Sequence, residues 1–333
     1  MKTESVLLNN LCVPCACRCR YCLLSWDGKP VGVPWERGNA FAVKFKEGLN
    51  KTRPELSFGY SFGYSMEHPN LREALRFLRS IGSPQAEYLQ CDGMRMRDVS
   101  ECRELAAMLK EEGVKRLNFT VYGEREYHDR FAARRGDFEL VLRMMSAAER
   151  AGLEVSAGIP ITKENIGSVN ELACYIKKQV SSCELFLFIP HEEGRGKALS
   201  SARLTEDDLL LIDKSLPARF NRALFRPERE WLNGFYMEET KRQLIISIRS
   251  DNIGRYEAMT PDEIVAEVEA LDDAYYAAYP SFYELAGLYG DMEGGKLYRQ
   301  RDLFYRYRRI YSEEHGINPY DITDECRSGT RRY

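Results

Sequence analysis

The sequence has no run of apolar residues that approaches the ~18 needed for a membrane-spanning helix. Its first ten residues, MKTESVLLNN, contain no long apolar segment behind the charged ones, so they do not form a secretory signal. The chain also lacks an excess of basic charge, since 48 Lys and Arg stand against 51 Asp and Glu, for a net charge of −3. This balance provides no positive field for nucleic acid. We therefore expect a cytoplasmic protein that binds neither membranes nor nucleic acids.

Composition excludes a disordered or fibrous chain, because 44% of the 333 residues are apolar and 30% are charged. A chain of this length suggests about two domains. Chains of this size bury roughly 75% of their unfolded surface and need no disulfide bonds for stability. The sequence therefore predicts a globular fold.

Cysteine is unusually concentrated at one point of the chain. Of ten cysteines, five lie within eleven residues. A disulfide framework would spread its cysteines along a short secreted chain, and this chain is neither short nor secreted. A cluster of thiols in a cytoplasmic protein indicates a metal site instead. The clustered residues are Cys12, Cys15, Cys17, Cys19 and Cys22.

Strand and helix patterns alternate along the first 220 residues. This alternation is typical of βαβ units and predicts an α/β fold with a parallel sheet. Ligands of such folds bind at the C-terminal ends of the strands, and the cysteine cluster directly follows the first predicted strand. The predicted strands are 5–10, 55–63, 86–90, 114–123, 153–162 and 183–190, and the predicted helices are 41–50, 71–82, 98–113, 137–152, 168–180 and 205–216.

The alternation stops near residue 220, so we predict a domain at 1–220 and a mostly helical C-terminal region at 221–333. One strand is expected there, at 242–250. A helix is expected at 259–280, with Thr260 as its N-cap, Pro261 in its first turn and Glu263 completing a capping box. The region is rich in aromatic residues, which favours a helical layer that packs on the barrel.

The cluster contains one triplet with the spacing C-x3-C-x2-C, formed by Cys15, Cys19 and Cys22. A zinc ribbon is an alternative, because Cys12 with Cys15 and Cys19 with Cys22 are two C-x2-C pairs. Zinc ribbons need about 15–20 residues between their pairs, however, and here only three intervene. Zinc is therefore the weaker interpretation, and Cys12 and Cys17 are expected to be spare thiols.

The segment CACRCRYC, residues 15–22, resembles the C-x3-C-x-aromatic-C signature of the radical S-adenosylmethionine superfamily, with Tyr21 in the aromatic position. The resemblance covers about residues 5–220, because that superfamily has a partial (β/α)6 barrel. It implies a [4Fe–4S] cluster bound by the three cysteines of the triplet, with the fourth iron open to S-adenosylmethionine. The enzyme would cleave this cofactor to a 5′-deoxyadenosyl radical, using an electron from a donor such as flavodoxin or ferredoxin.

The segment FGYSMEHPNL, residues 62–71, resembles the pattern of the family at its second strand. Gly63 matches the second glycine of this pattern, whereas Tyr64 replaces its glutamate. In the family this motif contacts the methionine amino group. The resemblance therefore implies a contact through the backbone here, or through Ser65.

Three later segments resemble a subgroup of the superfamily that contains molybdopterin-cyclase-like and peptide-modifying enzymes. The resemblance implies that the Thr120 hydroxyl reaches the ribose or carboxylate of S-adenosylmethionine. It also implies that Ile159 lies beside the adenine and that Arg195 pairs with the carboxylate. An ordinary strand threonine and a surface arginine remain alternatives for the first and last of these residues. The pair His128-Asp129 is expected to fix the loop after the fourth strand.

Residues 221–333 contain a single cysteine, Cys326, so we expect no auxiliary cluster there. We also expect no leader-peptide-binding domain ahead of the barrel. Some radical epimerases use a lone C-terminal cysteine to return a hydrogen atom to the substrate, and Cys326 is a candidate for that role. An incidental exposed thiol is the alternative. The substrate stays open between a peptide and a small molecule, and a non-catalytic iron–sulfur protein is a further alternative.

Overall fold

Two parallel sheets organise the residues that the computed structural model describes, which are 1–23, 32–63, 65–238 and 240–319. The first sheet has the strand order β2-β1-β9, and the second has the order β3-β4-β5-β6-β7. Every pairing within these two sheets is parallel. The strands are β1 (Lys2–Val13), β2 (Ser57–Gly63), β3 (Tyr88–Gln90), β4 (Arg116–Thr120), β5 (Glu154–Pro160), β6 (Glu184–Phe188), β7 (Ala218–Phe220) and β9 (Lys241–Ser247).

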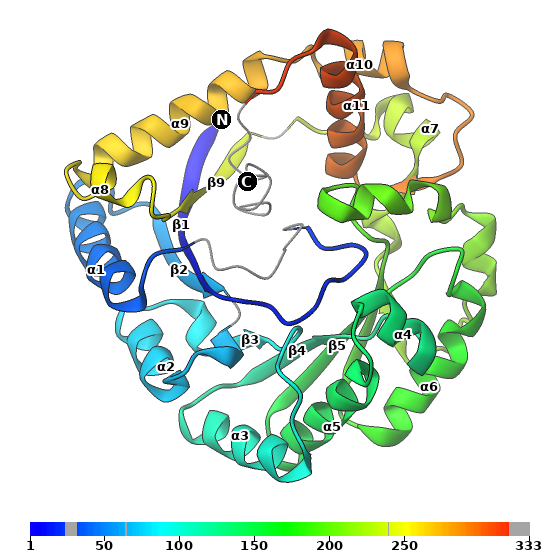
Figure 1. Ribbon diagram of the computed structural model, residues 1–333. Coiled ribbons are helices and arrows are strands. Elements are labelled where there is room, and N and C mark those ends of the chain that lie inside the picture. The colour runs from blue at the N-terminus through cyan, green and yellow to red at the C-terminus, as the bar shows by residue number, and fades with distance from the viewer. Residues whose placement is uncertain (24–31, 64, 239, 320–333) are drawn as a thin grey trace.

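Helices lie on the outer side of the strands, which curve into an arc (Figure 1). Each of the first five long helices links one strand to the next. A short helix, α4 (Arg125–Ala132), lies between β4 and α5 and was not predicted. The expected α/β fold, a partial barrel of parallel strands with outer helices, is confirmed. The linking helices are α1 (Trp35–Thr52), α2 (Leu71–Ser80), α3 (Val99–Glu111), α5 (Asp137–Arg150) and α6 (Val169–Gln179).

Apolar side chains fill the space between the strands and these helices. Behind the first sheet, Val6 and Leu8 of β1 belong to the same buried cluster as Phe45 and Leu49 of α1. Complete burial of one such leucine stabilises the fold by about 1.5–3 kcal/mol. Successive side chains of a strand point to opposite faces, so the alternate residues of β1 face the interior of the arc.

Residues beyond 220 add a strand to the first sheet as well as further helices. The strand predicted at 242–250 is β9, and it pairs with β1. Helix α9 (Pro261–Ala277) begins with the predicted capping box, in which the Glu263 amide donates to Thr260 Oγ1 at 3.3 Å and the Thr260 amide donates to Glu263 Oε2 at 2.7 Å. The other elements are β8 (Arg226–Pro227), α7 (Glu228–Glu230), α8 (Ile253–Tyr256), α10 (Phe282–Tyr289), β10 (Leu297–Tyr298) and α11 (Gln300–His315).

The helix predicted at 205–216 is wrong, because the chain forms only a short 3-10 turn there, at Asp207–Leu211. The side chain of Asn170 binds the backbone groups that a longer helix would use. Its Nδ2 donates to the Leu211 carbonyl at 2.8 Å, and its Oδ1 accepts from the Asp213 amide at 3.0 Å. Among the described residues, no helix has the length and apolar character that would let it cross a membrane.

Candidate functional site

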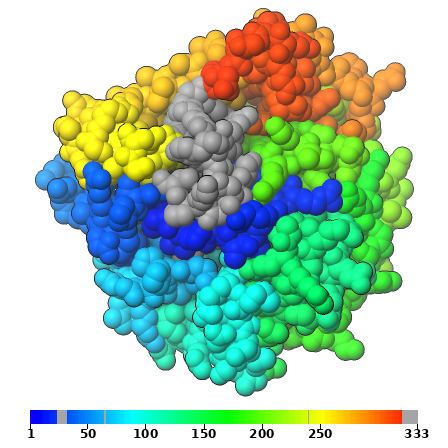
Figure 2. All heavy atoms as spheres, in the orientation of Figure 1, coloured from blue at the N-terminus to red at the C-terminus, as the bar shows by residue number. Residues whose placement is uncertain are grey.

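The cysteine loop, residues 14–23, follows the C-terminal end of β1 (Figure 1). On the face shown in Figure 2, the N-terminal residues, in the darkest blue, lie across the middle of the molecule. Ala16 N donates to Gly93 O at 2.9 Å, and Arg20 N donates to Phe131 O at 3.0 Å. Gly93 follows β3 and Phe131 lies on α4, which follows β4. The loop is thus fixed at the end of the strands where parallel folds bind their ligands.

Two glycines at strand ends let other backbones approach this loop. Gly93 has a φ of +69°, and a Cβ atom there would lie 2.1 Å from Cys15 Sγ. Gly63, at the end of β2, has a φ of +88°, and its Cβ would lie 2.7 Å from the Val13 carbonyl oxygen. Any other residue would be strained at both positions. Gly93 therefore leaves space beside a predicted iron ligand, whereas the cofactor contact predicted for Gly63 stays a prediction.

The sulfur atoms of the cluster do not converge on a single point. Among the described residues, no three cysteine sulfurs lie within 4.8 Å of one another. A tetrahedral zinc ion would hold its thiolates about 3.8 Å apart, given Zn–S bonds of about 2.3 Å. Cys12 is also turned toward β2, where its thiol donates to the Phe62 carbonyl at 3.8 Å. Cys12, which the zinc alternative requires, thus has a partner on β2, and the choice between zinc and an iron–sulfur cluster rests on the spacing of the motif.

Cys17 is buried against an acidic side chain. Its thiol donates to Asp137 Oδ2 at 3.7 Å, and the same carboxylate contacts His128 Nε2 at 3.1 Å and the guanidinium of Arg134. Burial alone would raise the pKa of Asp137, but these two partners outweigh it and hold the pKa below its ordinary value. The Cys17 thiol is also hydrogen-bonded to those of Cys15 and Cys19, so its role as a spare thiol stays a prediction.

Burial and neighbouring thiols disfavour the charged forms of these cysteines. The hydrogen bond shared with Cys17, together with burial, raises the pKa of Cys15 above its ordinary value. Burial also raises the pKa of Cys12 to about 11. A metal that binds a thiol deprotonates it outright, so iron binding would have to offset this unfavourable environment at Cys15.

Aromatic rings form a wall on one side of the cysteine loop. The ring of Tyr21 lies 5.5 Å from that of Tyr122 and 6.1 Å from that of Phe188. The hydroxyl of Tyr122 also contacts Cys19 Sγ at 2.9 Å. Burial, with the nearby Asp92 carboxylate, raises the pKa of Tyr21, so its hydroxyl stays protonated. Sequence reasoning missed Tyr122, although it lies two residues beyond Thr120 and strand alternation would have placed both on the same face.

Thr120 is paired with an acidic residue that sequence reasoning also missed. Its amide donates to Asp92 Oδ1 at 2.8 Å, and its hydroxyl donates to Asp92 Oδ2 at 2.7 Å. Gln90 Nε2 donates to Asp92 Oδ2 at 2.6 Å. Burial raises the pKa of Asp92 and outweighs the hydrogen bonds, which lower it. One signal in the sequence was the Asp-Gly turn that follows the third predicted strand.

The segment after β6 packs directly on the cysteine loop. Arg195 N donates to the Cys22 carbonyl at 3.0 Å. Gly194 has a φ of +57°, and a Cβ there would lie 2.5 Å from the same carbonyl oxygen. The structure therefore brings Arg195 next to the third cysteine of the triplet. Its contact with a carboxylate of the cofactor stays a prediction.

The same segment contains His191 and Glu193, which with Asp302 of α11 form a group of possible metal ligands within 4.8 Å of one another. Each of these ligands already has an arginine partner. Arg299 lies 3.4 Å from His191, Arg301 lies 3.1 Å from Glu193, and Arg203 lies 3.6 Å from Asp302. Three guanidinium charges disfavour a bound cation, so this group is an ion-pair network that anchors the segment to α11.

Ile159 is the remaining predicted cofactor contact, and its side chain packs in the core of the barrel. Its side chain is fully buried in the core cluster together with Ile161 and Leu187. No surface of it is exposed to a ligand, so the structure gives no support to the predicted contact with adenine. Tyr64 and Cys326 lie outside the described residues, as does the side chain of Ser65.

His128 and Asp129 fix the loop after β4, as predicted. His128 Nδ1 accepts from the Tyr122 amide at 3.1 Å. The Asp129 carboxylate accepts from the amides of Gly136 and Phe138, at 2.5 and 2.9 Å. These two side chains thus hold the start of α5, and with it Asp137, against the cysteine loop.

No family model and no curated protein match the chain. Solved structures do. One is anSMEcpe with bound S-adenosylmethionine, at 19% identity and a TM-score of 0.43, with 62% of this chain and 58% of that chain covered. Another is SuiB of Streptococcus suis bound to S-adenosylmethionine, at 10% identity and a TM-score of 0.46, with coverage of 74% and 59%.

A third similar structure is the coproporphyrinogen III oxidase HemN from Escherichia coli, described as a radical SAM enzyme. It has 12% identity and a TM-score of 0.40, with 92% of this chain and 90% of that chain covered. The chain spans less than two thirds of the length of anSMEcpe and SuiB. Because all three TM-scores lie below 0.5, the cysteine motif and the contacts around it have to carry any functional proposal.

Proposed function

We propose that this protein is a radical S-adenosylmethionine enzyme in which Cys15, Cys19 and Cys22 bind a [4Fe–4S] cluster. The observation that carries the proposal is the position of this triplet, on a loop fixed at the C-terminal end of β1 in a partial barrel of parallel strands. Gly93 supports it, because its missing side chain leaves space at the Cys15 sulfur. When reduced, the cluster would supply the electron that cleaves S-adenosylmethionine, and the resulting 5′-deoxyadenosyl radical would take a hydrogen atom from the substrate.

Asp92 and Thr120 are proposed to bind the sugar of the cofactor. A carboxylate near the end of a strand is the usual partner of ribose hydroxyls in parallel nucleotide-binding folds. Among the described residues, Asp92 Oδ1 accepts only the Thr120 amide, so it can accept a further hydroxyl. The Thr120 hydroxyl donates to Asp92 and shares a hydrogen bond with the Tyr21 hydroxyl, which leaves one lone pair for a ligand donor. The two residues would thus orient the cofactor beside the cysteine loop.

The aromatic wall and Arg195 complete the proposed site. Tyr21 and Tyr122 cover the loop with rings that exclude water from one side, which suits a reaction that passes through a radical. Arg195, held on Cys22, would supply a positive charge for the cofactor carboxylate. Residues 1–220 would therefore bind the cofactors. Residues 221–333 add β9 to the first sheet, together with the helices α9, α10 and α11.

Metal analysis of cysteine variants tests the proposed ligands. Protein purified without oxygen should contain iron and sulfide and absorb near ~400 nm. Replacement of Cys15, Cys19 or Cys22 by alanine should remove both, because each leaves one iron without its thiolate. Cys12→Ala is the matched control, since that thiol faces Phe62, and it should retain the cluster. Zinc without iron in the wild type, or loss of the cluster in Cys17→Ala but not in Cys19→Ala, would contradict the assignment.

The substrate and the electron donor are further parts of the proposal. A peptide and a small molecule both remain candidate substrates, and a flavodoxin or ferredoxin is the proposed donor. If the reaction is an epimerisation, Cys326 would return the hydrogen atom to the substrate radical. A thiol suits this step because its S–H bond is weak and its hydrogen exchanges with solvent.

A further inference from the structure

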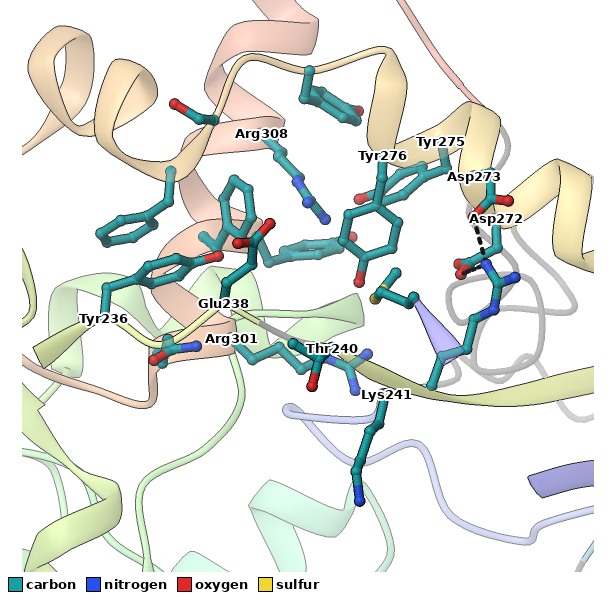
Figure 3. A pocket seen from close by; sticks show the side chains of 18 of the residues that line it. Tyr236, Glu238, Thr240, Lys241, Asp272, Asp273, Tyr275, Tyr276, Arg301 and Arg308 are labelled. Atoms are coloured by element: carbon teal, nitrogen blue, oxygen red, sulfur yellow. Dashed lines mark hydrogen bonds and ion pairs between the residues drawn. The ribbon is translucent and has the colours of Figure 1, made fainter. Parts of the chain in front are cut away.

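A cavity of about 1000 Å³ lies between β9 and the helices α9, α10 and α11 (Figure 3). Met1 and Lys241, at the N-terminal ends of β1 and β9, belong to its lining. The cysteine loop follows the opposite end of β1, and a strand of twelve residues spans roughly 40 Å. Met1 and Lys241 therefore lie at the far end of the strands from the cysteine loop, while other lining residues, such as Ile245 opposite Leu7, lie midway along them. The volume of the cavity is in the range of cavities that bind small molecules.

Six tyrosines and two phenylalanines line this cavity, and one buried arginine lies among them. Arg308 of α11 is only 7% exposed. Its guanidinium carbon lies 3.7 Å from the centre of the Phe304 ring, 4.4 Å from that of Tyr276 and 5.0 Å from that of Tyr275. Figure 3 shows Arg308 and Tyr276 pointing into the same space.

Arg308 differs from the other arginines of α11 in its partners. Arg301, Arg306 and Arg309 each form an ion pair with a glutamate. No carboxylate of the described residues pairs with Arg308, and its Nε atom is buried without a hydrogen-bond partner. Aromatic faces attract a cation but offer no acceptor for its N–H groups. A buried guanidinium in this state lacks the anion that would normally accompany it.

The carboxylates that line the cavity do not fill this role. Asp272 and Asp273 pair with Arg242, at 3.0 and 2.6 Å. Glu238 points into the cavity (Figure 3) but does not reach ion-pair distance of Arg308. Its negative charge disfavours a doubly charged phosphate more than a singly charged carboxylate.

We propose that this cavity binds an aromatic carboxylate, with the carboxylate on Arg308 and the ring among the tyrosines. The planar guanidinium can hold a carboxylate through two parallel hydrogen bonds, and the surrounding rings offer stacking surfaces for a flat apolar body. Arg308 also lines a second cavity of about 370 Å³ together with Lys197, two residues beyond Arg195. The inference stands on Arg308 and its surroundings and does not depend on the proposed radical chemistry.

Calorimetric titration of the full-length protein, purified without oxygen and in the absence of S-adenosylmethionine, tests this inference. The probes are 4-hydroxyphenylacetate and its neutral amide, which has the same shape. The acid should bind roughly tenfold or more tightly than the amide, because only the acid can form charged hydrogen bonds with Arg308. Arg308→Gln should abolish this preference, and Arg308→Lys, which keeps the charge, should retain part of it.

Arg306→Gln is the matched control on the same helix, since Arg306 pairs with Glu228 and does not line the large cavity. It should keep the preference for the acid, and circular dichroism would establish that each variant is folded. Equal binding of acid and amide to the wild type, or no binding of the acid at millimolar concentration, would overturn the inference. So would an unchanged preference in Arg308→Gln, or tighter binding of phenyl phosphate than of the acid.

Discussion

Replacement of Gly93 by alanine should prevent cluster binding while leaving the barrel folded. The new Cβ would lie 2.1 Å from Cys15 Sγ, about 1.4 Å short of an ordinary contact. The loop backbone cannot withdraw easily, because Ala16 N is bonded to Gly93 O at 2.9 Å. The Cys15 sulfur would have to move by more than half the length of a typical iron–thiolate bond. We therefore expect a large loss of iron, sulfide and absorption near ~400 nm in anaerobically purified G93A.

Gly113→Ala separates this effect from backbone strain. Gly113 has a φ of +75°, close to the +69° of Gly93, but its Cβ would meet only the flexible end of Arg79 at 3.3 Å. Alanine in the left-handed region costs about 1–2 kcal/mol, so both variants should unfold at a lower denaturant concentration, and Gly93→Ala at the lower of the two because of its added clash. Only Gly93→Ala should lose the cluster. Full iron and sulfide content in Gly93→Ala would refute the placement of the cluster at Cys15.

Three other changes test single contacts of the site. Asp92→Asn and Thr120→Val should weaken S-adenosylmethionine binding roughly ten- to a hundredfold by calorimetry while the cluster still forms; unchanged affinity in both would remove them from the cofactor site. Tyr122→Phe removes the hydroxyl that lies 2.9 Å from Cys19 Sγ. Hydrogen bonds to cluster sulfurs raise the reduction potential of a cluster, so a redox titration should show a lower potential in this variant. An equal or higher potential would contradict that contact. If the enzyme is an epimerase, Cys326→Ala should still form 5′-deoxyadenosine but should not form the product. The wild type should place solvent deuterium in the product formed in deuterated water. Complete product formation by the variant would exclude Cys326 as the hydrogen donor.

The barrel could be predicted from the sequence because its units are local. Apolar periodicity and glycines at helix ends indicate each strand and helix without knowledge of its neighbours. The pairing of β9 with β1 joins residues more than 230 positions apart, and no local pattern encodes such a partner. The failed helix at 205–216 has a similar cause, because the backbone there is bound by the side chain of Asn170 from a distant element.

The site shows the same division between local and distant information. The spacing of Cys15, Cys19 and Cys22 is a local feature, so it could be recognised in the sequence. Asp92 and Tyr122 become site residues only because the fold brings the ends of β3 and β4 to the cysteine loop. The C-terminal aromatics were expected to pack as one layer. Some do, such as Tyr298 and Tyr307 in a buried cluster, but others surround Arg308, and sequence periodicity does not distinguish packing from the lining of a cavity.

The most direct test of the central claim is the fate of S-adenosylmethionine on the anaerobic, cluster-loaded protein reduced with dithionite. A radical S-adenosylmethionine enzyme should release 5′-deoxyadenosine and methionine, and chromatography with mass detection would identify both products. Proteins with alanine at Cys15, Cys19 or Cys22 should release neither, whereas Cys12→Ala should behave as the wild type. A wild-type protein that carries a reducible [4Fe–4S] cluster yet forms no 5′-deoxyadenosine would contradict the claim and indicate an iron–sulfur protein without this activity.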